Sequence, residues 1–144
     1  MKLQYQLITF LVPSLLLACT TGNNIPDAPL QETQWQLIDI GYMAAEKSFP
    51  QTVLNQAHLH LNADGRQATG SDGCNRFFGV YALEGDKLTF GMMGSTRMAC
   101  PHADLDRIFY QSLKKTSRYQ INGEHLELLQ KDKLLLRFRV QQDK

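Results

Sequence analysis

The chain has 144 residues, of which 43% are hydrophobic and 20% are charged, which is the composition of one ordinary globular domain. A multidomain machine, a disordered tail and a collagen-like fibre are excluded. Fifteen Lys and Arg residues stand against 14 Asp and Glu residues, and without Lys2 the two numbers are equal. Because a neutral chain without a basic run lacks the charge that holds phosphates, we expect no nucleic-acid partner.

Residues 1–18 have the features of a bacterial lipoprotein signal peptide. Lys2 precedes an apolar stretch of roughly 11 residues, which at about 1.5 Å per residue is too short to span about 30 Å of hydrocarbon. The sequence Leu16-Leu17-Ala18-Cys19 resembles the lipobox recognised by lipoprotein signal peptidase. The resemblance implies cleavage before Cys19 and diacylation of its thiol; an ordinary secretory signal with an incidental Cys19 is the alternative.

The expected anchor sets the location. Two or three acyl chains, at about 0.8 kcal/mol per buried methylene, make attachment effectively permanent. Thr20 stands where enterobacterial lipoproteins retained in the inner membrane typically carry Asp. We therefore expect a lipid-anchored protein on the periplasmic face of the outer membrane, with membrane lipid as the partner of Cys19.

The stretch after Cys19 is rich in Thr, Gly, Asn and Pro and too polar to offset its ordering entropy. We expect residues 19–33 to be a flexible tether, residues 34–140 to be the folded domain and residues 141–144 to be a short tail.

Within the domain the dominant hydrophobic period is two, which predicts strands. The expected strands cover 35–40, 56–61, 66–69, 77–83, 87–90, 118–121, 126–129 and 134–140. The period changes to that of a helix over 103–113, with acidic residues near its start and lysines near its end. The expected fold class is mainly β (α+β): an antiparallel sheet curled into a half-barrel, with one covering helix.

Alternation also predicts which side chains share a face. In the first strand Asp39 can join Trp35 and Leu37 on one face. In the last strand Leu135 falls with the arginines on the face opposite Phe138. The segment 41–56 between the first two strands is longer than a tight hairpin and is expected to vary.

Cys74 and Cys100 remain as an even pair once Cys19 is assigned to lipid. In an oxidising compartment a structural disulfide is the favoured interpretation, and the chain-entropy estimate for its loop is about 3 to 3.5 kcal/mol. Two alternatives stay open: a pair of reduced, packed thiols, and a nucleophilic thiol with His102 as its base and Asp72 or Asn75 orienting it. Because the periplasm opposes a resting thiolate, we expect no enzyme and no cofactor.

Several segments together resemble a known family. They are Trp35-Gln36-Leu37, Asp64-Gly65-Arg66, Gly73-Cys74-Asn75, Leu88-Thr89-Phe90 and Ser95-Thr96-Arg97-Met98-Ala99-Cys100-Pro101. On these motifs the chain is similar, over about 34–140, to the META domain of HslJ-type heat-shock lipoproteins. The resemblance implies an antiparallel half-barrel with a helix and a role in envelope stress, including tolerance of heat and of the antibiotic novobiocin. It implies no defined reaction.

The remaining histidine, arginine and methionine side chains give weaker hypotheses. His58 and His60 share one strand face, but without a third ligand a solvated face is favoured over a metal site. Arg97 could bind an anion, and a salt bridge or a capping role is favoured. Met92, Met93 and Met98 could line an adaptable pocket, and core filling is favoured.

We therefore expect a non-catalytic envelope lipoprotein that supports the outer membrane under stress through protein contacts, with the partner unknown. A carrier of lipid or peptide, similar to secretion-system pilotins, is the alternative. A periplasmic thiol enzyme is a less favoured third hypothesis.

Overall fold

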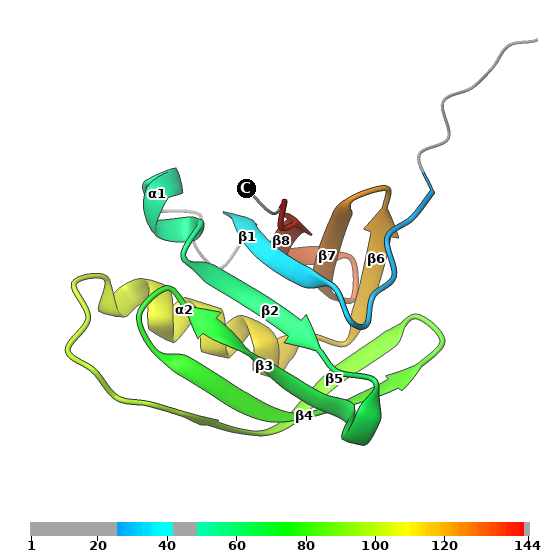
Figure 1. Cartoon of the computed structure of the whole chain (residues 1–144), viewed down its shortest axis with the longest axis horizontal. Coiled ribbons are helices and arrows are strands. Elements are labelled where there is room, and N and C mark those ends of the chain that lie inside the picture. The colour runs from blue at the N-terminus through cyan, green and yellow to red at the C-terminus, as the bar shows by residue number, and fades with distance from the viewer. Residues whose placement is uncertain (1–25, 42–48, 143–144) are drawn as a thin grey trace, which may run out of the picture.

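The computed structural model describes residues 26–41 and 49–142 (Figure 1). The expected signal peptide, Cys19, the first part of the expected tether and the last two residues lie outside these ranges. The elements are β1 (Gln34–Ile40), α1 (Gln51–Leu54), β2 (Ala57–Leu61), the 3-10 turn η2 (Asp64–Arg66), β3 (Gln67–Asp72), β4 (Arg76–Glu84), β5 (Lys87–Ser95), α2 (Ala103–Lys115), β6 (Arg118–Asn122), β7 (His125–Gln130) and β8 (Lys133–Val140).

The eight strands form one antiparallel sheet in the order β5-β4-β3-β2-β1-β8-β7-β6. The sheet curls until its two edge strands meet at one point. There the Tyr119 backbone N–H donates to the Asp86 carbonyl oxygen at 3.0 Å, and Arg118 pairs with the Asp86 carboxylate at 3.4 Å. The expected half-barrel of mainly β class, in a single domain, is confirmed.

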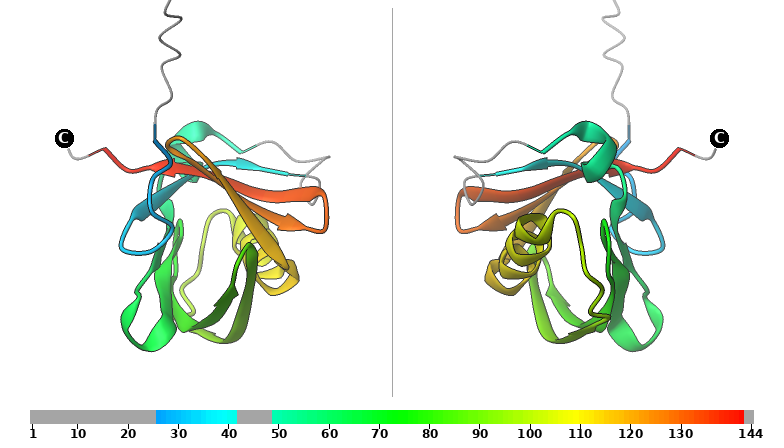
Figure 2. Two further views of the ribbon diagram at one scale, coloured as in Figure 1. Left: turned by 90° about the vertical axis from the view of Figure 1, so that its right-hand side faces the viewer. Right: turned by 90° about the vertical axis from the view of Figure 1, so that its left-hand side faces the viewer.

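Helix α2 lies against the concave side of this curl and contacts β3, β5, β7 and β8 (Figures 1 and 2). Acidic residues in its first turn and lysines in its last turn match the helix dipole. The helix ends at Lys115, and the next residue, Thr116, donates its hydroxyl to the Ser112 carbonyl oxygen at 2.9 Å. Its buried side chains are Leu105, Ile108, Phe109, Ser112 and Leu113, which is the predicted face apart from exposed Ala103.

The core fills the concave side with large apolar side chains. Trp35, Phe109 and Phe138 are fully buried. The Phe109 ring lies 5.6 Å from that of Phe77 and 6.3 Å from that of Phe138, and such tilted contacts add about 0.5–1.5 kcal/mol each. The interior of the half-barrel is therefore packed protein.

A β-bulge in β1 overturns the expected placement of Asp39. Leu37 pairs with Phe138 and Asp39 with Arg137, so Ile38 is an extra residue in the ladder. The bulge reverses the alternation beyond it. Asp39 consequently lies on the outer face, where its carboxylate pairs with Arg137 at 3.3 Å.

A second bulge corrects the prediction for β8. Leu128 and Leu129 are adjacent in β7 but pair with Leu136 and Leu134, which leaves Leu135 without a partner residue. Leu135 is fully buried, although alternation predicts it on the arginine face. A period of two cannot place a residue that the ladder skips.

Strand β5 extends five residues beyond the predicted end at Phe90. Gly79 pairs with Met93 and Tyr81 with Phe90, so β5 carries one residue more than β4 between these pairs. The glycines and methionines after Phe90 carry no β propensity signal, which explains why the sequence predicts a shorter strand.

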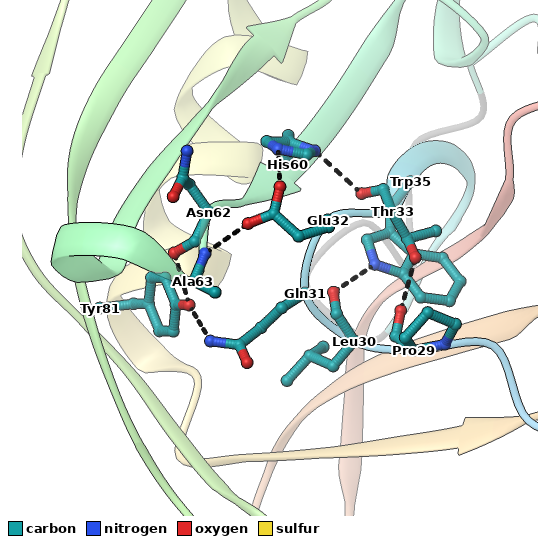
Figure 3. A network of polar contacts seen from close by, with 10 residues as sticks. All are labelled: Pro29, Leu30, Gln31, Glu32, Thr33, Trp35, His60, Asn62, Ala63 and Tyr81. Carbon is teal, nitrogen blue, oxygen red and sulfur yellow. Dashed lines mark hydrogen bonds and ion pairs between the residues drawn. The ribbon is translucent and has the colours of Figure 1, made fainter.

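Residues 27–33 pack onto the domain, which corrects the expected extent of the tether. The Ala28 N–H donates to the Gly123 carbonyl oxygen at 2.9 Å, and the Asp27 carboxylate accepts from the Gly123 N–H at 2.7 Å. Leu30 is buried, and its carbonyl oxygen accepts a hydrogen bond from the Trp35 indole at 2.9 Å (Figure 3). One leucine among polar residues gives no periodic signal, so the sequence hides this contact.

Side chains of the same segment reach β2, the residues just before η2, and β4 (Figure 3). The Gln31 amide donates to the Tyr81 hydroxyl, which donates to the Asn62 carbonyl oxygen at 2.8 Å. The Glu32 carboxylate accepts from the Ala63 N–H at 2.6 Å. Residues before β1 thus hold the loop between β2 and β3 in place.

Of the long segment between β1 and β2, Gly41 and residues 49–56 are described, and the latter contain the single turn α1. No helix in the described ranges is long and apolar enough to cross a bilayer.

Candidate functional site

A disulfide joins Cys74, in the turn between β3 and β4, to Cys100, in the loop between β5 and α2. Their Cα atoms are 6.0 Å apart across a separation of 26 residues. The closed loop contains all of β4 and β5. Neither sulfur is a thiol in this arrangement, so the nucleophile that the alternative hypothesis requires is not present here.

Asp72 shapes the turn that carries Cys74. One carboxylate oxygen accepts from the Cys74 N–H at 2.9 Å and from the Asn75 N–H at 2.7 Å. Gly73 has a φ of +102°, a conformation that disfavours any side chain. The Asp-Gly-Cys-Asn segment is therefore a side-chain-capped turn.

Asn75 ties this turn to the loop before α2. Its side-chain oxygen accepts from the Met98 N–H at 2.8 Å and from the Thr96 hydroxyl at 3.2 Å. Its amide nitrogen lies 3.2 Å from the Cys100 sulfur. The motifs around the two cysteines thus form one cross-linked corner, and the role of Asn75 in it is structural.

A small pocket of about 140 Å³ opens beside the disulfide. Its lining residues come from α1, the β3–β4 turn and the start of α2: Val53, Gln56, Asp72, Gly73, Cys74, Pro101, His102, Leu105 and Asp106. Asp72, Cys74 and His102, which the thiol hypothesis combines, do gather here. They meet in a pocket where the Cys74 sulfur is already bonded to Cys100.

Two carboxyl groups share this pocket. Asp72 is only 1% exposed, and its buried side chain shares a hydrogen bond with the carboxyl group of Asp106. Burial, together with the neighbouring Asp72 carboxylate, raises the pKa of Asp106 to about 6. Sequence reasoning missed Asp106 as a site residue because its place in the first turn of a helix already explained it.

The outer face of β4 and β5 carries an apolar surface that we call the outer patch, formed by Phe78, Val80 and Met92. These side chains are 65%, 49% and 88% exposed. They line a shallow hollow of about 600 Å³ together with Gln67, Thr69, Gly79, Met93 and Gly94.

Glycines in β5 let the outer patch lie flat. A Cβ atom on Gly94 would come within 2.8 Å of the Phe78 ring, and one on Gly91 within 3.0 Å of a Val80 methyl. The two side chains therefore rest across the neighbouring strand and present their upper surfaces to solvent. Sequence reasoning missed Phe78 and Val80 as site residues, and the available signal was two apolar side chains at alternate positions of the strand, on the face opposite Phe77 and Tyr81.

The favoured core-filling role is wrong for two of the three methionines. Met92 and Met98 are exposed, and only Met93 packs partly against the core. The bulge in β5 turns Met92 outward. Arg97 is exposed and forms no ion pair with a described residue, so the salt bridge is not found, while the capping role stays a prediction.

The two histidines of β2 face outward as predicted. The His60 ring lies 3.7 Å from the Glu32 carboxylate and 3.3 Å from the Thr33 carbonyl oxygen (Figure 3). The His58 ring lies 3.3 Å from the Gln56 carbonyl oxygen. Within residues 26–41 and 49–142, no group of three His, Cys, Asp or Glu side chains is placed to hold a metal ion.

Comparisons with solved structures support the fold. The chain is similar to a protein from Burkholderia xenovorans studied by NMR, with 28% identity, a TM-score of 0.63, and 79% of this chain and 85% of that chain covered. A second NMR structure has 23% identity, a TM-score of 0.59 and coverage of 77% and 91%. A protein of the DUF4847 family from Bacteroides vulgatus has 16% identity, a TM-score of 0.55 and coverage of 80% and 96%.

A search of curated proteins finds no match. The META domain family, by contrast, matches residues 28–143, a range that includes the packed segment before β1 as well as the disulfide corner and the outer patch. The protein therefore belongs to the META domain family.

Proposed function

We propose that this protein is a non-catalytic envelope lipoprotein of the HslJ-like kind, held to the periplasmic face of the outer membrane through an acylated Cys19. In this proposal it supports the outer membrane under heat or antibiotic stress by binding another envelope protein. The lipobox of the sequence motivates the anchor. The outer patch is the single observation that motivates the protein contact, because exposed apolar surface rimmed by polar residues is typical of interaction sites.

The position of the outer patch favours a protein partner over the anchoring bilayer. The chain enters the domain beside Gly123 in the β6–β7 turn, while β3, β4 and β5 form the opposite end of the molecule (Figure 2). Residues 19–26 reach at most about 28 Å when fully extended. A domain tied down at its entry point presents the far end to the periplasm.

The two other functions have less support. A carrier that holds lipid or peptide inside the barrel is disfavoured because aromatic and leucine side chains fill the concave side. A thiol enzyme is disfavoured because Cys74 and Cys100 are bonded to each other.

The anchor is tested by mass spectrometry of the N-terminal peptide of the protein isolated from its own membranes. Diacylated Cys19 at the first position supports the proposal. An unacylated first residue, or a chain that keeps residues 1–18, contradicts it.

The contact function is tested in cells whose only copy carries Phe78→Thr and Met92→Thr together. We expect reduced survival under heat and novobiocin at unchanged protein abundance. Thr89→Ser, on an exposed β5 residue outside the patch, is the matched control and should leave survival unchanged. Normal survival of the double variant would contradict a role for the outer patch.

A further inference from the structure

Strand β5 lies at one end of the sheet, and the second half of its outer edge is open. The start of β5 is closed off by β6, because the Tyr119 N–H donates to the carbonyl oxygen of Asp86, just before the strand. We call residues Gly91–Ser95 the open edge. Among the described residues they form backbone hydrogen bonds with β4 and with no other segment.

The register shows which backbone groups of the open edge point away from β4. The Thr96 N–H donates to the Arg76 carbonyl oxygen at 3.0 Å, and the ladder continues without a shift as far as Met93. Residues of an antiparallel strand direct their backbone groups alternately to the two sides. Thr96 and Gly94 therefore bond to β4. Met93 and Ser95 direct their N–H and carbonyl groups outward, where a further strand can pair with them.

The open edge lacks the features that usually keep strand edges apart. Natural edge strands carry charged residues or proline, which discourage pairing with another chain. Residues 88–95 contain neither. The closed part of the same edge does carry charges, since Arg118 pairs with Asp86 at 3.4 Å. The open edge is therefore suited to accept the backbone of a partner.

Two glycines bring the outer patch to this edge. The tip of the Phe78 ring lies over Gly94, where an added Cβ would be 2.8 Å from it, and a Val80 methyl lies over Gly91 at 3.0 Å. Met92 projects from the same face as Gly94, because the two are separated by one residue. An added strand would place two alternate side chains beside Gly94 and Met92. These side chains would be apolar, since they would contact the Phe78 ring and the Met92 thioether.

The next outward position indicates the charge of the partner. Thr96 lies opposite Arg76 of β4, and Arg76 belongs to the same face as Phe78 by alternation. Arg76 is exposed and forms no ion pair with a described residue, and the same holds for Arg97, which follows Thr96. A carboxylate in the added strand beside Thr96 would complement these arginines.

We propose that the open edge binds an extended segment of a partner protein as an added strand, antiparallel to β5. In this segment an acidic residue is followed, at alternate positions, by two apolar residues. The binding mode rests on the protein contact proposed above for the outer patch and adds the form that the partner takes. The partner's backbone exchanges hydrogen bonds with Met93 and Ser95. Its outward side chains contact Arg76, Phe78 and Met92 in turn.

The test is a titration of the whole chain, purified in detergent, with the capped peptide Thr-Glu-Thr-Leu-Thr-Leu-Thr, followed by NMR and amide hydrogen exchange. In antiparallel register the glutamate lies beside Thr96, and the leucines lie beside Gly94 and Met92. At saturation the exchange of the Met93 and Ser95 amides should slow at least about tenfold, because both gain an acceptor. Unchanged exchange of both amides in the saturated complex would overturn the proposal.

A matched peptide separates backbone pairing from side-chain contact. Methyl groups on the backbone nitrogens of the two threonines around the first leucine keep every side chain but remove the N–H groups that face Met93 and Ser95. This peptide should bind at least about tenfold more weakly. Equal affinity, with signals of Phe78 and Met92 shifted and the two β5 amides unprotected, would refute strand addition while the contact at the outer patch stands.

A third peptide tests the acidic position. Lysine in place of the glutamate should weaken binding about twofold or more, because a cation then lies beside Arg76. The loss should shrink as salt is added. Equal affinity of the lysine peptide at low salt would refute the charge assigned to the partner.

A variant of the chain tests the same edge from the other side. Ser95→Pro deletes an outward N–H that does not bond to β4, so the existing ladder is kept. It should weaken peptide binding at least about tenfold. Ser95→Ala keeps the N–H and, as the matched control, should change the affinity less than about twofold. Unchanged affinity of folded Ser95→Pro would refute the assignment, and the methylated peptide makes the same test on the unaltered chain.

Dilution distinguishes a partner from a second copy of this chain. Protection of the Met93 and Ser95 amides without peptide, increasing with protein concentration, would show that β5 pairs with β5 of another copy and would overturn the assignment to a partner. Failure of the contact function is seen separately, as normal survival of cells with Phe78→Thr and Met92→Thr under stress.

Discussion

The outer surface of the sheet is charged over β1, β8 and β7 but apolar over β4 and β5. On the charged side Arg137 lies between Glu127, at 2.8 Å, and Asp39, at 3.3 Å. On the apolar side Phe78 and Val80 lie across β5, and Met92 projects beside them. Both surfaces sit on the same core, so folding does not require the outer patch to be apolar. The difference indicates that the charged side faces water while the apolar side is adapted to contact a partner.

Adjacent phenylalanines give the largest expected contrast between core and outer patch. Phe77 is 2% exposed and Phe78 is 65% exposed. Phe77→Ala should lower the free energy of unfolding in urea by about 3–5 kcal/mol. Phe78→Ala should change it by less than about 0.5 kcal/mol. Similar losses in the two variants would show that the patch is part of the core.

The disulfide encloses the strands that carry the outer patch. Cys74→Ala should lower the free energy of unfolding by about 3 kcal/mol, because the unfolded chain regains the entropy of an open loop. Cys100→Ala should have the same effect, and the double variant should be no worse than either. Additive losses would mean that the two cysteines are not paired in the working protein.

A smaller loss in the free energy of unfolding is expected for changes on the charged part of the outer surface, over β1, β8 and β7. Arg137→Met leaves Glu127 and Asp39 near each other without their shared cation, and it should cost about 1 kcal/mol in low salt because the pairs are partly exposed. The loss should shrink as salt is added. Combining Arg137→Met with Glu127→Gln isolates the pair energy in a double-mutant cycle, and zero coupling would refute the stabilising role of this ion pair.

The smallest expected effect on stability comes from the carboxyl group of Asp106. The pKa of Asp106 is raised to about 6 from 3.8, so the folded state holds its proton more tightly than the unfolded state does. Its contribution to stability is therefore present at acidic pH and is lost as the pH rises between these two values.

Asp106→Asn should remove that loss and raise the melting temperature more at neutral than at acidic pH. Because Asp106 is only partly buried, solvent screening keeps the gain below about 1 kcal/mol. Asp104→Asn serves as the control and should not change the pH dependence. A gain from Asp106→Asn that is equal at both pH values would contradict the raised pKa.

Sequence patterning predicted the eight strands and the long helix in their order along the chain, because alternation and turn residues are local signals. It failed where the ladder skips a residue. Bulges at Ile38 and Leu135 reverse the alternation, and a bulge is decided by both strands together. Leu30 and the segment around it were also hidden, because their contacts join residues far apart in the chain.

The candidate site was predictable in part. The even pair of cysteines left after Cys19, together with the oxidising compartment that the lipobox predicts, favoured the disulfide that the structure contains. The meeting of Asp72 with Asp106 depends on how α2 packs against β3, which no local pattern encodes. The outer patch was visible only as apolar residues at outward positions, and alternation alone gives no reason to treat them as a site.

The most direct test of the proposed contact is photocrosslinking in living cells from two positions on the outer surface. A photoreactive residue at Val80, inside the outer patch, should give one defined protein adduct that disappears with Met92→Thr. The same residue at Arg139, on the charged side, should give no such adduct. No adduct from Val80, or identical adducts from both positions, would contradict the account.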